Sequence, residues 1–237
     1  MKNKIYHMRR ILILIILSAF LASCASLGKY RELPEVKAWE SEIEKFEQLD
    51  VAKSYPSDAI MFAGSSSIRL WSTLGKDMLP YNVIQRGYGG AKLSDFAVYA
   101  DRILYPHQCQ AIVLFIANDI TGSDNDKSPV EVSQLFRKTL YIIRRQFRDT
   151  PVFWVSVTPT PLRWHVWPEI KEAGEMIREI CEDHRNTYYI DTERYFTNSS
   201  GLPRAELFLD DRLHLNEEGY KVWSGVIKNE LDNKLMK

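Results

Sequence analysis

Four short, widely separated segments of this chain contain side chains that could carry out nucleophilic chemistry. They are residues 62–68, 86–90, 117–119 and 211–214. Together they supply a candidate serine nucleophile, two candidate hydrogen-bond donors for an oxyanion, and an acid–histidine pair. Serine-based acyl transfer uses these groups. Each segment alone is a weak signal, and their order and placement carry the prediction.

The candidate nucleophile lies in the segment Gly64–Ser67, which turns from a predicted strand into a helix. Ser66 there sits near a helix N-terminus, where free backbone N–H groups favour developing negative charge. The alternative is that Ser65, Ser66 and Ser67 only cap the helix, which is a common role for serine.

Asp211 and His214 are three residues apart. In a helical turn this spacing puts both side chains on one face. The carboxylate could then orient the imidazole and stabilise its protonated form. The alternative is a surface loop with an incidental histidine. Asp210 is a competing acid at a poorer spacing.

Two further segments could bind negative charge. The loop Gly87–Gly90 is too short for a dinucleotide fingerprint or a phosphate-binding loop, but its glycines allow the backbone to approach a ligand closely. Asn118 follows a predicted strand and can donate from its side-chain amide. Ordinary turn chemistry is the alternative for both.

Short apolar runs alternate with helical patterns along the chain. We expect strands at Ala59–Ala63, Val83–Gln85, Ala111–Ala117, Val152–Val157 and Tyr188–Asp191. We expect helices at Val36–Ala52, Ile68–Leu74, Ser94–Leu104 with Ser94 as N-cap, Val130–Phe147, Ile170–His184, and from Leu215 to about Leu231.

The strands are apolar throughout, as expected when both faces of a sheet are covered. The pattern predicts a doubly wound, three-layer α/β/α sandwich with a mainly parallel five-stranded sheet. In such sheets, sites form at the carboxyl ends of the strands. Ser66, Gly90, Asn118 and the loop Thr158–Trp167 all follow predicted strands directly.

The order and content of these segments resemble the SGNH, or GDSL-type, hydrolase superfamily over nearly all of residues 55–231, which implies its flavodoxin-like fold. The resemblance implies Ser66 as nucleophile, and the Ser66 N–H, the Gly90 N–H and the Asn118 amide as oxyanion donors. It implies Asp211 and His214 as the acid and base. The corresponding blocks are Gly64-Ser65-Ser66, Gly87–Gly90, Ile116–Asp119 and Asp211–His214.

Two positions depart from that family's pattern. Ser65 replaces the aspartate of the first block, and Ile116 replaces the glycine of the third. Neither change removes a proton-transfer group, so we expect a serine esterase that needs no metal and no organic cofactor. A non-catalytic, glycan-binding protein of the same fold is the alternative from another class.

The substrate is expected to contact the loop Thr158–Trp167. Trp164, Trp167 and Tyr88 could form a stacking wall for a sugar, with Arg163 reading a polar or acidic group. The alternative is that both tryptophans pack this loop onto the fold. We expect a small acyl group, such as acetyl on a carbohydrate, and the alternative enzyme is a lysophospholipase or short-chain lipid esterase.

The N-terminus has the pattern of a bacterial lipoprotein signal. Basic residues precede an apolar run from Ile11 to Ala22, and Leu21–Cys24 resembles a lipobox. We therefore expect a signal peptide at 1–23, a lipidated tether at 24–34 that begins with Cys24, and one catalytic domain at 35–237. This pattern predicts an envelope protein anchored at the periplasmic face of the outer membrane. An ordinary signal peptide or an uncleaved anchor is the alternative.

Charge and cysteine content limit the remaining partners. The first 23 residues hold four of the 31 basic residues and none of the 31 acidic ones, so the rest of the chain is mildly acidic. Nucleic acid is not an expected partner, because that binding rests on clustered Lys and Arg. Cys109 and Cys181 are expected to be buried free thiols, with a disulfide as the alternative. No pattern in the sequence indicates an oligomeric state.

Overall fold

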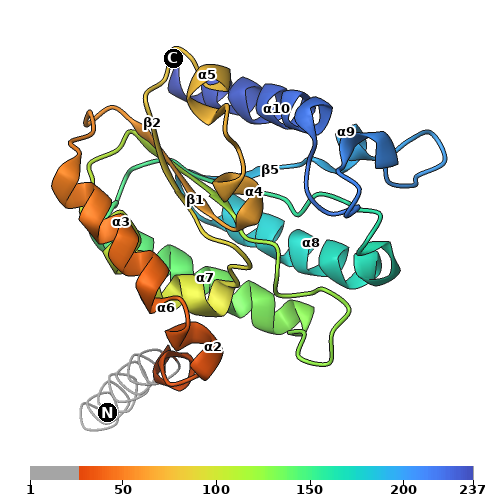
Figure 1. The fold of residues 1–237 in the computed structure, drawn as a ribbon, viewed down its shortest axis with the longest axis horizontal. Coiled ribbons are helices and arrows are strands. Elements are labelled where there is room, and N and C mark those ends of the chain that lie inside the picture. Colours follow the sequence, from red (N-terminus) through yellow and green to blue (C-terminus); the bar gives the residue numbers. More distant parts are fainter. Residues whose placement is uncertain (1–26, 237) are drawn as a thin grey trace, which may run out of the picture.

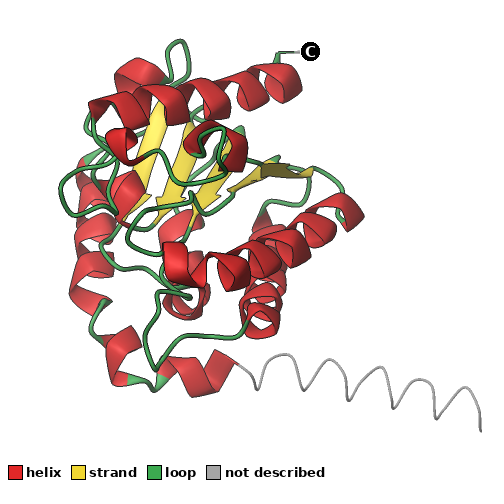
Figure 2. Ribbon diagram, turned by 90° about the vertical axis from the view of Figure 1, so that its right-hand side faces the viewer, coloured by secondary structure: helices red, strands yellow, loops and turns green. Residues whose placement is uncertain are grey.

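The computed structural model describes residues 27–236 as a three-layer α/β/α sandwich (Figure 1, Figure 2). All strand pairs of its five-stranded sheet are parallel, in the order β2-β1-β3-β4-β5. The strands are β1 (Ile60–Gly64), β2 (Val83–Gly87), β3 (Ala111–Phe115), β4 (Val152–Val155) and β5 (Thr187–Ile190). The predicted fold class is therefore confirmed.

Helices cover both faces of this sheet, which explains why β1 and β3 are buried at every residue. One layer holds α3 (Glu40–Ala52), α6 (Leu93–Leu104), α7 (Pro129–Gln146) and α8 (Trp167–Asp183), with the short α2 (Pro34–Lys37) at its edge. The other holds α4 (Ser66–Arg69), α5 (Leu74–Asp77), α9 (Glu193–Phe196) and α10 (Glu217–Leu235). Two 3-10 turns, η1 (Trp164–Val166) and η2 (Ala205–Leu207), lie in loops.

Most expected helix boundaries differ from the observed ones by a few residues, and three differences change the description of the fold. The first helix is split into α2 and α3, and the second is split into α4 and α5. The expected N-cap Ser94 is wrong, because α6 already begins at Leu93. Asp95 determines this start, since its carboxylate accepts the Lys92 N–H at 3.0 Å.

The strand order reverses direction at β1, which has β2 on one side and β3 on the other. Residues directly after these three strands therefore meet at one edge of the sheet. Such a reversal is where open α/β sheets place their ligand sites. The turns after β1, β2 and β3 contain Ser66, Gly90 and Asn118.

The segment before α2 contacts the domain. Tyr30 is buried, and its hydroxyl donates to Glu131 of α7 at 2.5 Å. Leu27 and Leu33 also pack against the core. The part of the expected tether that begins at residue 27 thus lies on the protein. Cys24 and the expected signal peptide lie outside the described residues.

Two further findings concern the cysteine thiols and the possibility of a membrane-spanning helix. Cys109 and Cys181 are free, and burial raises the pKa of each thiol to about 12. None of the helices within residues 27–236 combines the length and the apolarity needed to cross a membrane.

Candidate active site

Close backbone packing fixes the turn between β1 and α4. Gly64 has φ +138°, and a Cβ there would lie 1.9 Å from the carbonyl oxygen of Phe115. The next residue, Ser65, donates its N–H to that same oxygen at 2.8 Å. Only glycine fits this position, because any side chain would collide with β3. The start of α4 is thereby attached to the neighbouring strand.

Ser66 is the first residue of α4 and is partly exposed. Its hydroxyl oxygen lies 3.0 Å from Nε2 of His214, although the two residues are 148 positions apart. The Ser65 side chain makes no capping hydrogen bond to α4. The capping alternative therefore does not describe this turn, and the Ser66 hydroxyl is left to the histidine.

Asp211 and His214 lie on a tight turn rather than on the expected helical turn. Their side chains are joined by a hydrogen bond of 2.6 Å between Nδ1 of His214 and Oδ2 of Asp211. The other carboxylate oxygen accepts the N–H groups of Leu213 and His214, both at 2.9 Å. The turn is closed where the Leu209 N–H donates to the His214 carbonyl at 2.8 Å.

These contacts determine the protonation pattern of the imidazole. A carboxylate at Nδ1 favours the tautomer with hydrogen on that nitrogen, which leaves Nε2 as an acceptor for the Ser66 hydroxyl. Partial burial raises the pKa of Asp211, but hydrogen bonds from the side chain and backbone of His214 and from Leu213 outweigh it. The net effect is a lowered pKa, so Asp211 is ionised at neutral pH.

Asn118 follows β3 and lies beside the glycine loop that follows β2. Its Nδ2 donates to the carbonyl of Ala91 at 3.0 Å, and its Oδ1 accepts a hydrogen bond from Arg163 at 2.7 Å. Gly90, directly before Ala91, is exposed and has φ +75°. A Cβ on Gly90 would lie 3.4 Å from the ring of Trp39, which therefore borders this loop.

A hollow of about 420 Å³, part of it open to solvent, joins these groups. Ser66, His214 and Asn118 all line it. Its apolar wall is formed by Phe115, Val157, Phe208, Leu213 and Leu215. The arrangement places a polarised hydroxyl, a base and an amide donor around one small space, which is what acyl transfer to a serine requires. Within residues 27–236, no group of three or more His, Cys, Asp or Glu side chains could hold a metal ion.

Tyr88 cannot serve in the expected stacking wall. Its side chain is fully buried, and its hydroxyl donates to Asp95 at 2.6 Å. Burial raises the pKa of Tyr88, and it raises that of Asp95 to about 7 despite the hydrogen bonds from Tyr88 and Lys92. The first residue after β2 points into the core, which the alternation of glycines around it did not reveal.

Arg163 lines the catalytic hollow, but its guanidinium is engaged by acceptors of the protein itself. It is buried and donates to the carbonyl of Ala117 and to Oδ1 of Asn118. Trp164 and Trp167 stack on each other with centroids 5.8 Å apart and planes 18° apart. Neither tryptophan lines the hollow, and Trp167 packs against the core. The packing alternative describes this loop better.

Two residues near the glycine loop were not identified from the sequence. Trp39 lies within the expected helix Val36–Ala52, and nothing in the sequence pattern connects it with the site. Arg69 is exposed, and its guanidinium lies 3.2 Å from where a Cβ on Gly89 would stand. No spacing rule connects either residue to the loop, because both reach it through tertiary packing.

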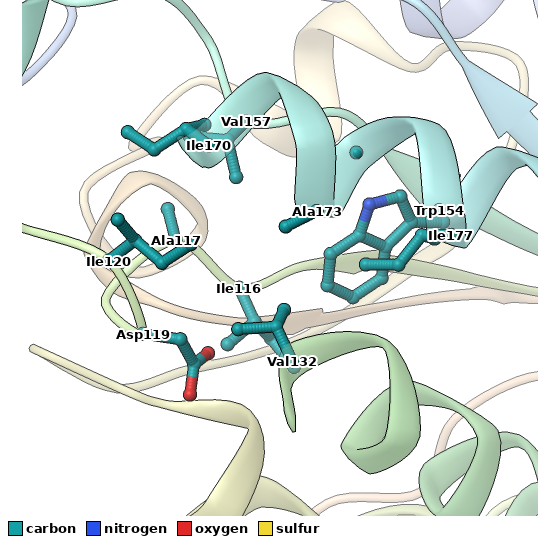
Figure 3. A pocket seen from close by; sticks show the side chains of 11 residues that line it. Ile116, Ala117, Asp119, Ile120, Val132, Trp154, Val157, Ile170, Ala173 and Ile177 are labelled. Carbon is teal, nitrogen blue, oxygen red and sulfur yellow. The ribbon is translucent and has the colours of Figure 1, made fainter. Parts of the chain in front are cut away.

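A second hollow of about 360 Å³, part of it open to solvent, lies between the sheet and helices α7 and α8 (Figure 3). It shares Ala117 and Val157 with the catalytic hollow. The remaining wall is mostly aliphatic, with Asp119 and the Trp154 ring at its margins. The two spaces therefore lie side by side, with Ala117 and Val157 between them.

Comparison with known families settles the affiliation of the chain. Residues 57–222 match the model of the GDSL-like Lipase/Acylhydrolase family. This chain belongs to that family. The matched range contains Ser66, Asn118, Asp211 and His214, and it begins after α3. As a family member the protein is an ester-hydrolysing serine hydrolase.

Several solved structures share the fold of this chain. A Streptococcus pneumonia protein, provisionally described as a platelet activating factor, superimposes with a TM-score of 0.71 at 20% identity, covering 82% of this chain and 93% of its own. A GDSL-like lipase from Bacteroides thetaiotaomicron gives 0.67 at 14% identity, covering 81% and 98%. A mutant acetyl-xylooligosaccharide esterase from Geobacillus Stearmophilus gives 0.58 at 12% identity, covering 73% and 94%. The comparison with curated proteins finds no match.

Proposed function

We propose that this protein is an envelope esterase that removes small acyl groups, such as acetyl, from carbohydrate through an acyl-enzyme on Ser66. The observation that carries the proposal is the continuous hydrogen-bond chain from Asp211 through His214 to the Ser66 hydroxyl. This chain ends in a solvent-connected hollow of modest size.

In the first step, the Ser66 hydroxyl oxygen attacks the ester carbonyl while Nε2 of His214 takes its proton. Asp211 stabilises the resulting imidazolium through Nδ1. The imidazolium then gives its proton to the departing alkoxide, and the acyl group stays on Ser66. A water molecule, activated by the same histidine, hydrolyses the acyl-enzyme and restores the serine.

The negative charge on the carbonyl oxygen needs hydrogen-bond donors in both steps. We assign this role to the backbone N–H of Ser66, the backbone N–H of Gly90 and the side-chain amide of Asn118. Ser66 lies in the first turn of α4, where an N–H has no carbonyl four residues earlier within the helix. The Asn118 amide has two N–H hydrogens, and Ala91 takes only one of them.

The preference for a small acyl group rests on the shape of the hollow. Bulky side chains, above all those of Phe115, Phe208 and Leu215, close its apolar wall. Two of the structural neighbours are named as an acetyl xylan esterase and an acetyl-xylooligosaccharide esterase. Trp39 and Arg69 flank the glycine loop outside the hollow. In place of the buried Tyr88, they are the side chains that we expect to contact a sugar beyond its acyl group.

The test is hydrolysis of p-nitrophenyl acetate by the full chain in detergent, with Ser66→Ala measured beside it. We expect turnover in the wild type and none above background in the variant. Equal turnover in both proteins would reject Ser66 as the nucleophile. Acetylated xylo-oligosaccharides would then be compared with lysophospholipids to identify the natural class of ester.

A lipid esterase is the second candidate, and two observations favour it. Leu70, Leu162 and Leu209 are 41–49% exposed on segments that border the site. The second hollow, behind Ala117 and Val157, could receive a longer acyl chain if these two side chains moved apart. Ala173→Leu narrows that hollow. It should slow octanoyl ester hydrolysis and spare acetyl ester hydrolysis if lipid chains use this space.

We also propose that Cys24 carries the lipid anchor, because small residues lead directly into it. The test is metabolic labelling of expressing cells with radioactive palmitate, comparing the wild type with Cys24→Ala. Label in the wild type alone, recovered with outer membranes, would support the proposed location. Label in neither protein would reject lipidation.

A further inference from the structure

Arg163 has an unusual environment for a charged side chain. It is only 9% exposed, and the ion pairs found within residues 27–236 do not include it. Its two hydrogen-bond acceptors are the backbone carbonyl of Ala117 and Oδ1 of Asn118. A buried cation is normally paired with a carboxylate, because leaving water is costly for a charge. Here only neutral oxygens beside the proposed oxyanion site accept its hydrogen bonds, and the Asp126 carboxylate attracts the positive charge through space.

We propose that Arg163 is a positioning residue for catalysis, which fixes the Asn118 amide and places a positive charge behind it. The proposal rests on the proposed function, in which Asn118 donates to the oxyanion. It assigns Arg163 no contact with the substrate.

Arg163 helps to set the orientation of the Asn118 amide. An asparagine side chain can rotate by half a turn and exchange its oxygen for its nitrogen. Arginine is only a donor, so the atom of Asn118 that faces Arg163 has to be Oδ1. The amide nitrogen therefore points toward Ala91 and the glycine loop. Without Arg163, the carbonyl of Ala91 would be the one remaining contact that holds the amide in this orientation.

The positive charge of Arg163 acts on both the Asn118 amide and the oxyanion. A cation that donates to a carbonyl oxygen withdraws electron density from the amide and makes its N–H a stronger donor. The oxyanion that forms during acyl transfer is negative, and a low-dielectric surrounding strengthens its attraction to a nearby cation. Arg163 is already in place before the reaction, so no reorganisation is needed when the charge develops.

Backbone hydrogen bonds hold Arg163 and its loop in place. Its backbone N–H donates to the Thr160 hydroxyl at 3.3 Å, and its carbonyl accepts the Val166 N–H at 3.1 Å. The neighbouring Leu162 donates its N–H to the carbonyl of Arg212 at 3.0 Å. Arg212 lies between Asp211 and His214. The loop that carries Arg163 thus contacts both sides of the site.

A double-mutant cycle on turnover tests the proposal in the full chain. Arg163→Met keeps most of the side-chain volume but removes its charge and its donors. We expect it to lower kcat for p-nitrophenyl acetate roughly tenfold to a hundredfold with little change in KM, since the effect is confined to the transition state. In the Asn118→Ala background the same substitution should cost less than about threefold. Full additivity of the two substitutions would overturn the proposal.

Arg163→Lys separates charge from geometry. It keeps a buried cation but lacks the planar fork, so we expect a smaller loss than for Arg163→Met. The matched control is Arg144→Met. Arg144 also donates to backbone carbonyls, those of Phe147, Thr150 and Asn186, but none of its contacts involves the site. It should lose stability with kcat unchanged. If Arg144→Met lowered kcat as much as Arg163→Met does, the effect of Arg163→Met would be structural and the proposal would be overturned.

A measurement without turnover distinguishes failure of this proposal from failure of the proposed function. In the wild type, NMR should show the two amide protons of Asn118 well separated and slow to exchange with water. Arg163→Met should move them toward the values of a free asparagine, and Arg144→Met should not. Unchanged Asn118 signals in Arg163→Met would overturn the proposal whether or not Ser66 proves to be the nucleophile.

Discussion

The two sides of Ser66 are built in different ways. On one side, Asp211 and His214 form a turn whose hydrogen bonds run between residues at most five positions apart, and the Asp211 side chain is 46% exposed. On the other side, Asn118 is held by Ala91 and Arg163, which are 27 and 45 positions away. That side is largely buried and includes the carboxyl groups of Asp95 and Asp119.

The difference shows how each side obtains its geometry. The acid–histidine turn is determined locally and can be recognised from a four-residue pattern. The side that would bind the oxyanion is determined by packing between β2, β3 and the loop after β4. We therefore expect the exposed side to control proton transfer and the buried side to control both charge stabilisation and the stability of the fold.

The largest expected effect concerns proton transfer. Ser66→Ala or His214→Ala should lower ester turnover by roughly three to six orders of magnitude, because each removes a group that reacts. Steady-state kinetics on p-nitrophenyl acetate measures this loss. Ser200→Ala, in an exposed loop, is the matched control and should retain wild-type turnover. A variant of Ser66 with near-normal rates would contradict the assignment.

The next effect concerns charge stabilisation on the buried side. Asn118→Ala should lower kcat by roughly 10² to 10³, which is the usual effect of removing one oxyanion donor. The same assay measures it, with KM expected to change little. A loss smaller than about threefold would mean that Ile116 has displaced the amide from the reacting centre.

A third prediction uses the raised pKa of Asp95. The folded protein holds this proton to about pH 7, whereas the unfolded chain releases it near pH 3.8. Between these values the folded state binds more protons, so stability falls as the pH rises and is level above pH 7. Between pH 5 and pH 8 the wild type should lose roughly 3 kcal/mol of its free energy of unfolding through this group. Asp95→Asn should remove that loss. Urea unfolding of both proteins at the two pH values measures it, and parallel curves would refute it.

Asp211 should give the opposite pH dependence, with the free energy of unfolding rising as the pH rises. Its pKa is lowered in the folded protein, so its contribution to stability is present above its unfolded pKa and is lost as the pH falls. Because the side chain is nearly half exposed, this contribution is screened by water and should be small. Asp211→Asn measured beside Asp95→Asn would show the two opposite slopes.

The smallest expected effect on the kinetics concerns substrate choice. We expect acetyl esters to be hydrolysed roughly tenfold faster than octanoyl esters with the same aryl leaving group, since a closed apolar wall discriminates by only 1–3 kcal/mol. Values of kcat/KM for the p-nitrophenyl series measure this preference. A preference for the octanoyl ester would favour the lipid esterase.

The sequence predicted most of the fold because the strands are short, apolar and regularly spaced. It also indicated Ser66, which directly follows a predicted strand, and Asp211 and His214, whose three-residue spacing is a recognisable local pattern. It failed for Tyr88, because a side chain in a loop can point into the core or into solvent, and tertiary packing decides between them. It also did not reveal that Ala117 and Asn118 engage the Arg163 guanidinium. Trp39 and Arg69 were missed for the same reason, as both reach the glycine loop from other elements.

The attachment of the Ser65 backbone to Phe115 has a consequence for the order of folding. β1 forms the middle of a three-strand unit whose partners are both made later in the chain, and each further strand joins the outer edge in sequence order. The contact between Ser66 and His214 closes the longest loop in the site. During refolding, esterase activity should therefore return after the circular dichroism of the sheet and helices has recovered.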